Sequence, residues 1–170
     1  MDSIGELSGI FHSEIGLGTI FVRLCAAAFL GLLMGLDREY RQHPAGMRTH
    51  MLVSLASATF AVLTFEIIAL TSGGGLAIRS DPVRAIGAVT AGVSFLAAGT
   101  IIQSRGRVQG LTTGAGMWLA GAIGLACGIG AFGVAVVATL LGVVILAVLA
   151  LVTPALPRRK GEERERAPEE

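Results

Sequence analysis

The sequence contains few charged residues. Asp, Glu, Lys and Arg make up only 15% of its 170 residues, whereas 53% are hydrophobic and the mean hydropathy is +0.74. A water-soluble domain of this length cannot cover so much apolar surface with polar groups. The shortage of charge therefore excludes an ordinary soluble domain and indicates a protein that lies within a membrane.

Cysteines and nucleophile-base pairs are also scarce. Cys25 and Cys127 are the two cysteines, and neither has the spacing of a metal site or of a disulfide-rich secreted domain. We interpret both as small packing residues. His43 and His50 have no Ser or Cys nucleophile set beside them and are interpreted as solvated residues. The sequence thus indicates no enzyme, no metal site and no cofactor.

Basic residues are missing from the N-terminal segment. Its charged residues are Asp2, Glu6 and Glu14, whereas a secretory signal peptide begins with a basic region. We therefore expect the first apolar stretch to remain in the mature protein.

What the sequence does contain is a series of five long apolar stretches, each close to the ~20 residues that cross a ~30 Å hydrocarbon layer as a helix. We expect spans at about 17–36, 49–71, 83–102, 111–127 and 132–152. A tight hairpin is expected between the last two, because one helix over residues 111–153 would be about twice as long as the layer is thick. Asp81 before Pro82 is expected to cap the third span, and Thr112 or Thr113 the fourth. The predicted fold class is an all-α, polytopic transmembrane helical bundle.

The distribution of basic residues predicts the orientation of this bundle. Ten of the thirteen Lys and Arg residues lie between spans one and two, between spans three and four, or after span five. Because cytoplasmic loops carry the excess of positive charge, the N-terminus is expected outside and the C-terminus inside. Residues 1–16 then form an extracytoplasmic leader, residues 17–153 the transmembrane domain, and residues 154–170 a charged cytoplasmic tail that is too polar to pack.

Small residues recur at four-residue spacing within the spans. Helices in lipid pack through such residues, because lipid is as apolar as the side chains it would replace. The small-residue faces are Ala27, Gly31 and Gly35; Ala88 and Gly92; Ala120, Gly124 and Gly128; and Ala138 and Gly142. We interpret them as contacts that hold the bundle together, and a homodimer interface is the alternative. The fifth span has the fewest small residues and is expected to face lipid most.

Two ionisable side chains lie well inside the predicted spans. Arg23 is in the first and Glu66 in the second, and a charge at such a position costs roughly 2.5–3.5 kcal/mol. Both lie near the outer ends of antiparallel neighbours, so an intramembrane ion pair is expected. Two alternatives stay open: the side chains reach the outer surface, or Glu66 belongs to an ion or proton site. A hydrated Mg²⁺ ion needs several oxygen ligands, which one carboxylate does not supply.

Two inner loops carry most of the other candidate residues. Both lead into helices whose N-terminal amides point to the cytoplasm, and both contain arginines, an arrangement that binds carboxylate or phosphate groups. Asp37 and Glu39 are expected to pair with Arg41, Arg48 or Arg105. The candidates for partner or anion binding are Asp37, Arg38, Glu39, Arg41, Gly46, Arg48, Thr49, Arg105, Arg107, Gly110, Thr112 and Thr113. Internal salt bridges alone are the alternative explanation of these charges.

Five strings of residues carry a resemblance to a known family. They are GLDREY, AGMRTHMLV, DPVRAIGAVTAGVSFLAAGTII, VQGLTTGAGMW and LAGAIGLACGIG, and the similarity around them covers roughly residues 20–150. In this order and spacing they resemble the membrane domain of the MgtC/SapB family of bacterial inner-membrane proteins. The sequence departs from the family pattern at Asp37, Ala88, Ser94 and Ala98. Well-known members also continue into a cytoplasmic ACT-like domain, where this sequence ends in the short charged tail.

The resemblance implies a non-enzymatic regulator linked to magnesium homeostasis. Such a protein would act by binding other inner-membrane proteins, among them the proton-translocating ATP synthase. Its expected surroundings are the lipid bilayer and these partners, with no nucleic acid. The alternative function is a Mg²⁺ or proton transporter or channel that uses Glu66.

Overall fold

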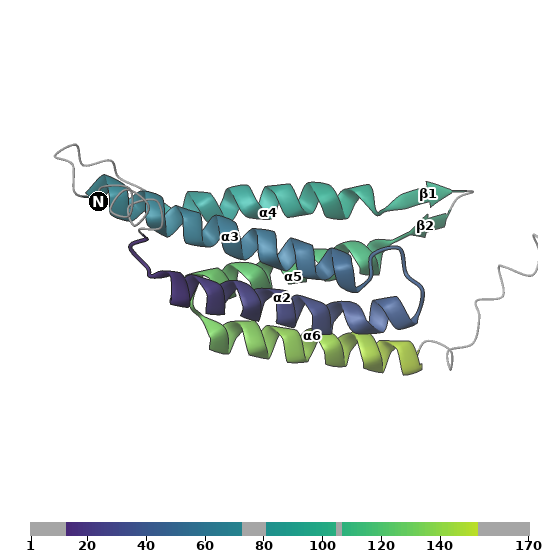
Figure 1. The fold of residues 1–170 in the computed structure, drawn as a ribbon. Helices are drawn as coiled ribbons and strands as arrows, with labels where there is room; N and C mark the ends of the chain where they lie inside the picture. The colour runs from purple at the N-terminus through teal and green to yellow at the C-terminus, as the bar shows by residue number, and fades with distance from the viewer. Residues whose placement is uncertain (1–12, 73–80, 105–106, 153–170) are drawn as a thin grey trace, which may run out of the picture.

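The computed structural model of the chain describes residues 13–72, 81–104 and 107–152. Within these ranges, five helices lie lengthwise beside one another, and a short β-hairpin extends from one end (Figure 1). The elements are α2 (Leu17–Tyr40), α3 (Met47–Ser72), α4 (Pro82–Gly99), β1 (Ile102–Ser104), β2 (Arg107–Gln109), α5 (Leu111–Ile129) and α6 (Phe132–Val152). We call the end of the bundle that holds the last turn of α2, the first turns of α3 and α5, and the β-hairpin the hairpin end. The opposite end, with the turn at Gly130, is the Gly130 end.

The predicted helical membrane bundle is confirmed, and the short β-hairpin is an addition that the sequence did not predict. Four helices, α2 to α5, are long and apolar enough to cross a membrane. The fifth predicted stretch is helical over Phe132–Val152, as expected, and it is apolar over at least Phe132–Val148. Its crossing of the bilayer stays a prediction, as does the orientation of the bundle.

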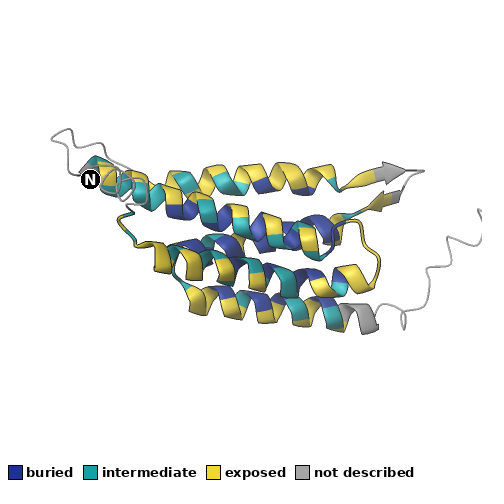
Figure 2. Cartoon of the chain, viewed as in Figure 1, coloured by how far each residue is buried: buried dark blue, intermediate teal, exposed yellow. Residues whose placement is uncertain are grey.

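Helix α5 occupies the centre of the bundle and packs against α2, α3, α4 and α6. In its most apolar window 61% of the residues are buried, whereas the corresponding window of α4 is only 11% buried. Figure 2 shows this contrast as a largely exposed α4 beside inward-facing buried residues on the other helices. The expectation that the fifth span faces lipid most is therefore wrong, because α6 docks through Ala135 and Thr139, and α4 is the more exposed helix.

Three of the four small-residue faces are filled by neighbouring helices. A Cβ added at Gly31 of α2 would lie 2.7 Å from the carbonyl oxygen of His50 in α3, and one at Gly128 of α5 would lie 2.6 Å from that of Ala58. A Cβ at Gly142 of α6 would lie 2.8 Å from Met34 Sδ of α2. These contacts confirm that small residues hold the bundle together. The face of Ala88 and Gly92 differs, because a Cβ at Gly92 would meet nothing within 4 Å.

The ends of the helices follow local chemistry with two corrections. Asp81 caps α4 by accepting a 3.0 Å hydrogen bond from the Val83 amide, as predicted. Gly130 adopts a left-handed conformation (φ 86°) that lets α5 turn tightly into α6, which confirms the hairpin. The N-cap of α5 is Gly110, also left-handed, rather than Thr112 or Thr113.

The second correction concerns the third predicted span, which was placed at residues 83–102. Helix α4 ends at Gly99, and Ile102 instead begins β1, which pairs with β2 in antiparallel register. The apolar run continues past the end of the helix. Hydrophobicity alone therefore does not show at which residue a helix ends.

Candidate functional site

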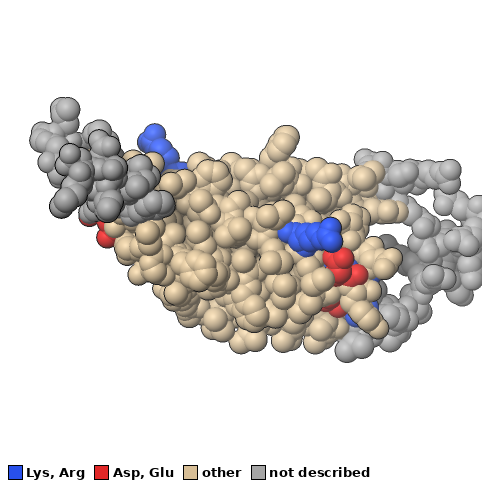
Figure 3. All heavy atoms as spheres, viewed as in Figure 1, with Lys and Arg blue, Asp and Glu red and all other residues tan. Residues whose placement is uncertain are grey.

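The predicted partner- or anion-binding residues that the structure describes lie at the hairpin end. Asp37, Arg38 and Glu39 belong to the last turn of α2, which extends to Tyr40, instead of to a loop. On the face shown in Figure 3, charged side chains gather toward the two ends of the bundle and leave its middle uncharged. Such a distribution suits a body whose middle lies in hydrocarbon.

Asp37 and Arg41 form the predicted ion pair. Arg41 Nε donates to Asp37 Oδ1 at 2.8 Å, one helical turn apart. Both side chains are partly exposed, at 39% and 21% for Arg41 and Asp37. An exposed pair of this kind contributes little to stability, about 0.3–0.5 kcal/mol. No pairing of Asp37 or Glu39 with Arg48 occurs in the part of the chain that the structure describes, and Arg105 lies outside it.

Glu39 stabilises the start of the next helix. Its Oε2 accepts a 3.1 Å hydrogen bond from the amide of Met47, the first residue of α3. A carboxylate at this position satisfies one of the orphan amides of the helix and interacts favourably with the helix dipole. Gly46 lies directly against this carboxylate, and a Cβ at Gly46 would collide with it. Gly46 therefore permits the cap.

Arg38 and His50 are buried, which the sequence interpretation of His50 missed. Arg38 is only 5% exposed and His50 is fully buried, whereas His43 is exposed. His50 Nδ1 lies 2.9 Å from the carbonyl oxygen of Gly46, so Nδ1 carries the proton. A Cβ added at Gly116 of α5 would lie 3.1 Å from Nε2. The signal in the sequence was the small and polar face of α3 at helical spacing, which includes His50, Ser54 and Ala58.

The remaining candidates for partner or anion binding differ in their exposure. Arg48 and Thr112 are exposed, Thr49 is half-buried, and Thr113 is buried. Gly110 packs against the carbonyl group of Thr100. Arg107 is a residue of β2.

At the Gly130 end, Arg23 and Glu66 stabilise two different helix termini. Arg23 Nη1 donates to the carbonyl oxygen of Gly128, in the last turn of α5, at 2.8 Å. Glu66 Oε1 accepts from Ser13 Oγ at 2.5 Å and from the Ile15 amide at 3.2 Å. A cation at a helix C-terminus and a carboxylate just before a helix N-terminus are both favourable.

The predicted ion pair between Arg23 and Glu66 is therefore wrong. Among the described residues no salt bridge joins them, and each side chain has the partners given above. Depth along the helix was estimated correctly, since both residues lie at the same end. Hydropathy does not reveal, however, which groups become the partners of these side chains. Arg23 and Glu66 each bind polar backbone groups at a helix terminus and not each other.

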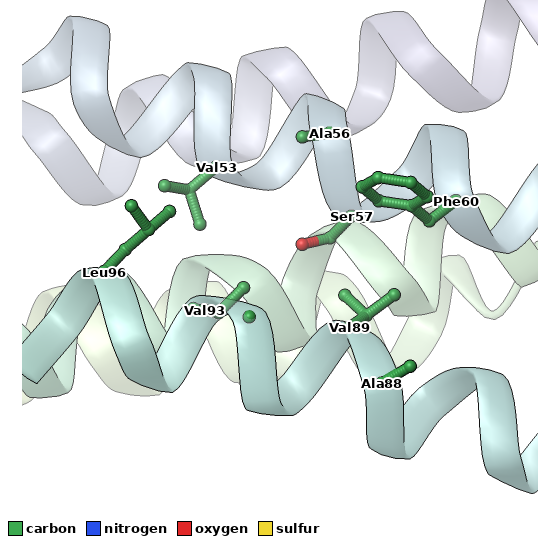
Figure 4. Close-up of a pocket in the computed structure, with 9 residues that line it drawn as sticks. Val53, Ala56, Ser57, Phe60, Ala88, Val89, Val93 and Leu96 are labelled. Carbon is green, nitrogen blue, oxygen red and sulfur yellow. The ribbon is translucent and has the colours of Figure 1, made fainter.

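An apolar groove runs between α3 and α4. It encloses about 340 Å³ and is lined from α3 by residues such as Val53 and Ser57, and from α4 by Ala88, Gly92 and Leu96. Figure 4 shows the Ser57 hydroxyl directed toward α4 across this groove. Ser57 is 1% exposed, and its Oγ has no hydrogen-bond partner in the described part of the molecule.

The cysteines have different positions. Cys127 is buried in the core, which confirms a packing role, whereas Cys25 is exposed on the outside of α2. Within the described residues, no group of three or more His, Cys, Asp or Glu residues is placed to hold a metal ion.

Comparison with known proteins identifies relatives for most of this chain. The MgtC family matches residues 24–154. A protein named MgtC from Brucella abortus is 40% identical over 131 residues, which make up 77% of this chain and 50% of that protein. MgtC from Salmonella typhimurium is 36% identical over 120 residues, covering 71% of this chain and 48% of the relative. An uncharacterized protein of Synechocystis is 35% identical over 71% of this chain.

The chain spans about half the length of the curated relatives that it matches. No solved structure matches it. The match over residues 24–154, the identity to bacterial relatives and the four apolar helices agree on a multi-pass protein of the bacterial inner membrane. The chain belongs to the MgtC family.

Proposed function

We propose that this chain is a non-enzymatic regulator that binds an apolar helix of another inner-membrane protein in the groove between α3 and α4. The observation that carries the proposal is the contrast between the small-residue faces. Those of α2, α5 and α6 are filled by neighbouring helices, whereas Gly92 of α4 faces open space beside a groove of about 340 Å³. Small residues permit a partner helix to approach closely in lipid.

Two further features support a helical partner. Ser57 brings an unpartnered hydroxyl to the groove, and a hydroxyl in lipid gains from an acceptor on an adjacent helix. The exposed Arg48 and the Asp37–Arg41 pair at the hairpin end supply polar contacts at the edge of the membrane. The proposed link to magnesium homeostasis comes from family membership, and the ATP synthase is the first candidate partner that the family resemblance implies.

A transporter that uses Glu66 is the alternative. Both oxygens of that carboxylate already accept hydrogen bonds, from Ser13, Glu14 and Ile15. A permeating cation would have to compete with these donors, which favours a structural role for Glu66.

Site-specific photocrosslinking in native membranes tests the proposal. A photoreactive residue at Leu96, which borders the groove and is 52% exposed, is compared with one at Val144 of α6, which is 54% exposed. We expect a protein adduct from position 96 and none from position 144, with mass spectrometry identifying the partner. An adduct of this chain with itself would instead indicate a homodimer.

Two results would contradict the proposed regulator function. One is an equal adduct from both positions, because the groove would then have no special role. The other is a Mg²⁺ flux in proteoliposomes that disappears in Glu66→Gln, because that result assigns the protein to transport.

A further inference from the structure

Unpartnered polar atoms concentrate at the hairpin end. In the described part of the molecule, five enclosed side-chain atoms have no hydrogen-bond partner: Arg23 Nε, Asp37 Oδ2, Arg38 Nε, His50 Nε2 and Ser57 Oγ. Three of them belong to Asp37, Arg38 and His50. Other buried polar groups are satisfied, as Ser54 is by the carbonyl of Ala27 and Thr139 by that of Ala135. Since native proteins satisfy nearly all buried polar atoms, such a concentration indicates a missing ligand or solvent.

The two carboxylates next to Arg38 in the sequence are already engaged with other groups. Asp37 is paired with Arg41, and Glu39 caps the first turn of α3. No ion pair or hydrogen bond of the Arg38 side chain occurs among the described residues. The Nε–H of Arg38 is enclosed without an acceptor, and an enclosed donor of a charged group is unfavourable when it has no partner. Arg38 therefore has no anionic partner among the described residues, and a bound anion would supply one.

The surroundings of Arg38 suit an oxyanion. Arg38 belongs to the buried face of α2, one turn after Gly35, and Gly35 packs against Met47, one turn before His50 in α3. Opposite His50 lies Gly116 of α5, and the buried Thr113 lies one turn closer to the start of that helix. The N-cap of α5, Gly110, provides no side-chain hydrogen bond. The first amides of α5 are thus available to an anion.

We propose that Arg38 and the uncapped first turn of α5 bind one phosphate group at the hairpin end, beside His50. The planar guanidinium donates in parallel to two phosphate oxygens, and the helix amides neutralise part of the remaining charge. Arg38 is 5% exposed, and we expect the phosphate group to reach its guanidinium through this small opening. Inorganic phosphate and the headgroup of an anionic lipid share this chemistry. The proposal does not depend on a partner helix in the groove of α4.

The test uses the full chain with its arginine side chains labelled with ¹⁵N. In detergent, inorganic phosphate is titrated, with sodium chloride at equal ionic strength as the control. In nanodiscs without free phosphate, phosphatidylglycerol is compared with phosphatidylcholine, whose phosphate is shielded by choline. We expect the Arg38 Nε–H resonance to shift with phosphate, with phosphatidylglycerol, or with both, and the arm that responds identifies the source.

Variants separate the site from general electrostatics. Arg38→Gln should weaken phosphate-group binding by about tenfold or more, since it removes a charge-assisted pair of hydrogen bonds. Arg38→Lys keeps the charge but loses the planar fork and should bind with intermediate affinity. Arg48→Gln removes an exposed arginine at the same end and should change affinity less than about twofold.

Any of three results would overturn the proposal: neither phosphate source shifts the Arg38 resonance, chloride shifts it equally, or Arg48→Gln weakens binding as much as Arg38→Gln does. If Arg38→Gln does not fold, Arg38→Lys and the wild-type titration still decide the outcome.

Discussion

At the scale of single residues, Arg23 and Glu66 illustrate how a membrane helix retains a charge. Each is placed where the backbone of a helix leaves polar groups unsatisfied, Arg23 at the end of α5 and Glu66 before the start of α2. The backbone of a helix terminus thereby replaces the opposite charge as the partner. The two side chains hold the Gly130 end together through these hydrogen bonds.

Glu66→Gln should lower the free energy of unfolding by about 1–3 kcal/mol. In the wild type the Glu66 carboxylate accepts hydrogen bonds from Ser13, Glu14 and Ile15. The substitution replaces one carboxylate oxygen by an NH₂ group, which cannot accept these hydrogen bonds. The thermal unfolding midpoint in detergent measures the effect, and Thr64→Ala, two residues earlier in α3, serves as the control. Equal midpoints for wild type and Glu66→Gln would remove this structural role.

Gly46→Ala should destabilise the protein by about 1–2 kcal/mol, because the added methyl displaces Glu39 from the amide of Met47. A double-mutant cycle with Glu39→Ala isolates the cause. In the Glu39→Ala background the collision is absent, so Gly46→Ala should cost clearly less there. Additive effects of the two substitutions would show that the glycine acts through something other than the cap.

At the scale of elements, the glycines of α5 decide how closely the helices approach. A Cβ at Gly124 would collide with the carbonyl group of Ser54 in α3, whereas a Cβ at Gly87 in α4 would meet nothing within 4 Å. The same residue type thus has a packing role in the central helix and none in the peripheral one. Helix α4 is correspondingly the element that is free to receive a partner.

Gly124→Ala and Gly87→Ala form a matched pair that tests this difference. Gly124→Ala should cost about 1–3 kcal/mol through overpacking against α3. Gly87→Ala should be neutral or stabilise by up to about 1 kcal/mol, because alanine favours the helix. Thermal unfolding in the same detergent compares them, and an equal loss in both variants would refute the central position of α5.

At the scale of the whole molecule, the orientation in the membrane remains to be tested. The hairpin end carries Arg38, Arg41 and Arg48 and is expected to face the cytoplasm. In intact cells, a membrane-impermeant thiol reagent should therefore label a cysteine at Glu14, which is exposed near the Gly130 end, and not one at Tyr40, which is 88% exposed at the hairpin end.

Native Cys25 and Cys127 are replaced by alanine in this experiment, and permeabilised cells show that both positions react. Labelling of position 40 in intact cells would invert the orientation and would place the proposed phosphate site on the outer face.

The sequence anticipated features that depend on a few neighbouring residues. Asp81 before Pro82 predicted the start of α4, and the glycines near Gly130 predicted the turn into α6. The pairing of Asp37 with Arg41 was one of the pairings expected from the sequence. Errors arose where several segments contribute: Gly110 replaced the threonine caps because the chain before it folds as a β-hairpin, and His50 became buried because α2 and α5 both cover it.

The sequence by itself determined that the chain is a bundle of apolar membrane helices with small residues for packing, because length, hydropathy and four-residue spacing are local properties of each helix. Only the tertiary structure decided that α5 is central, that α4 is largely exposed, and that Arg23 and Glu66 stabilise separate helix ends. It also decided that Arg38 is buried with its Nε unpartnered among the described residues. These features depend on which helix faces meet. The free energy of such contacts is shared between residues far apart in the chain, so no single segment encodes it.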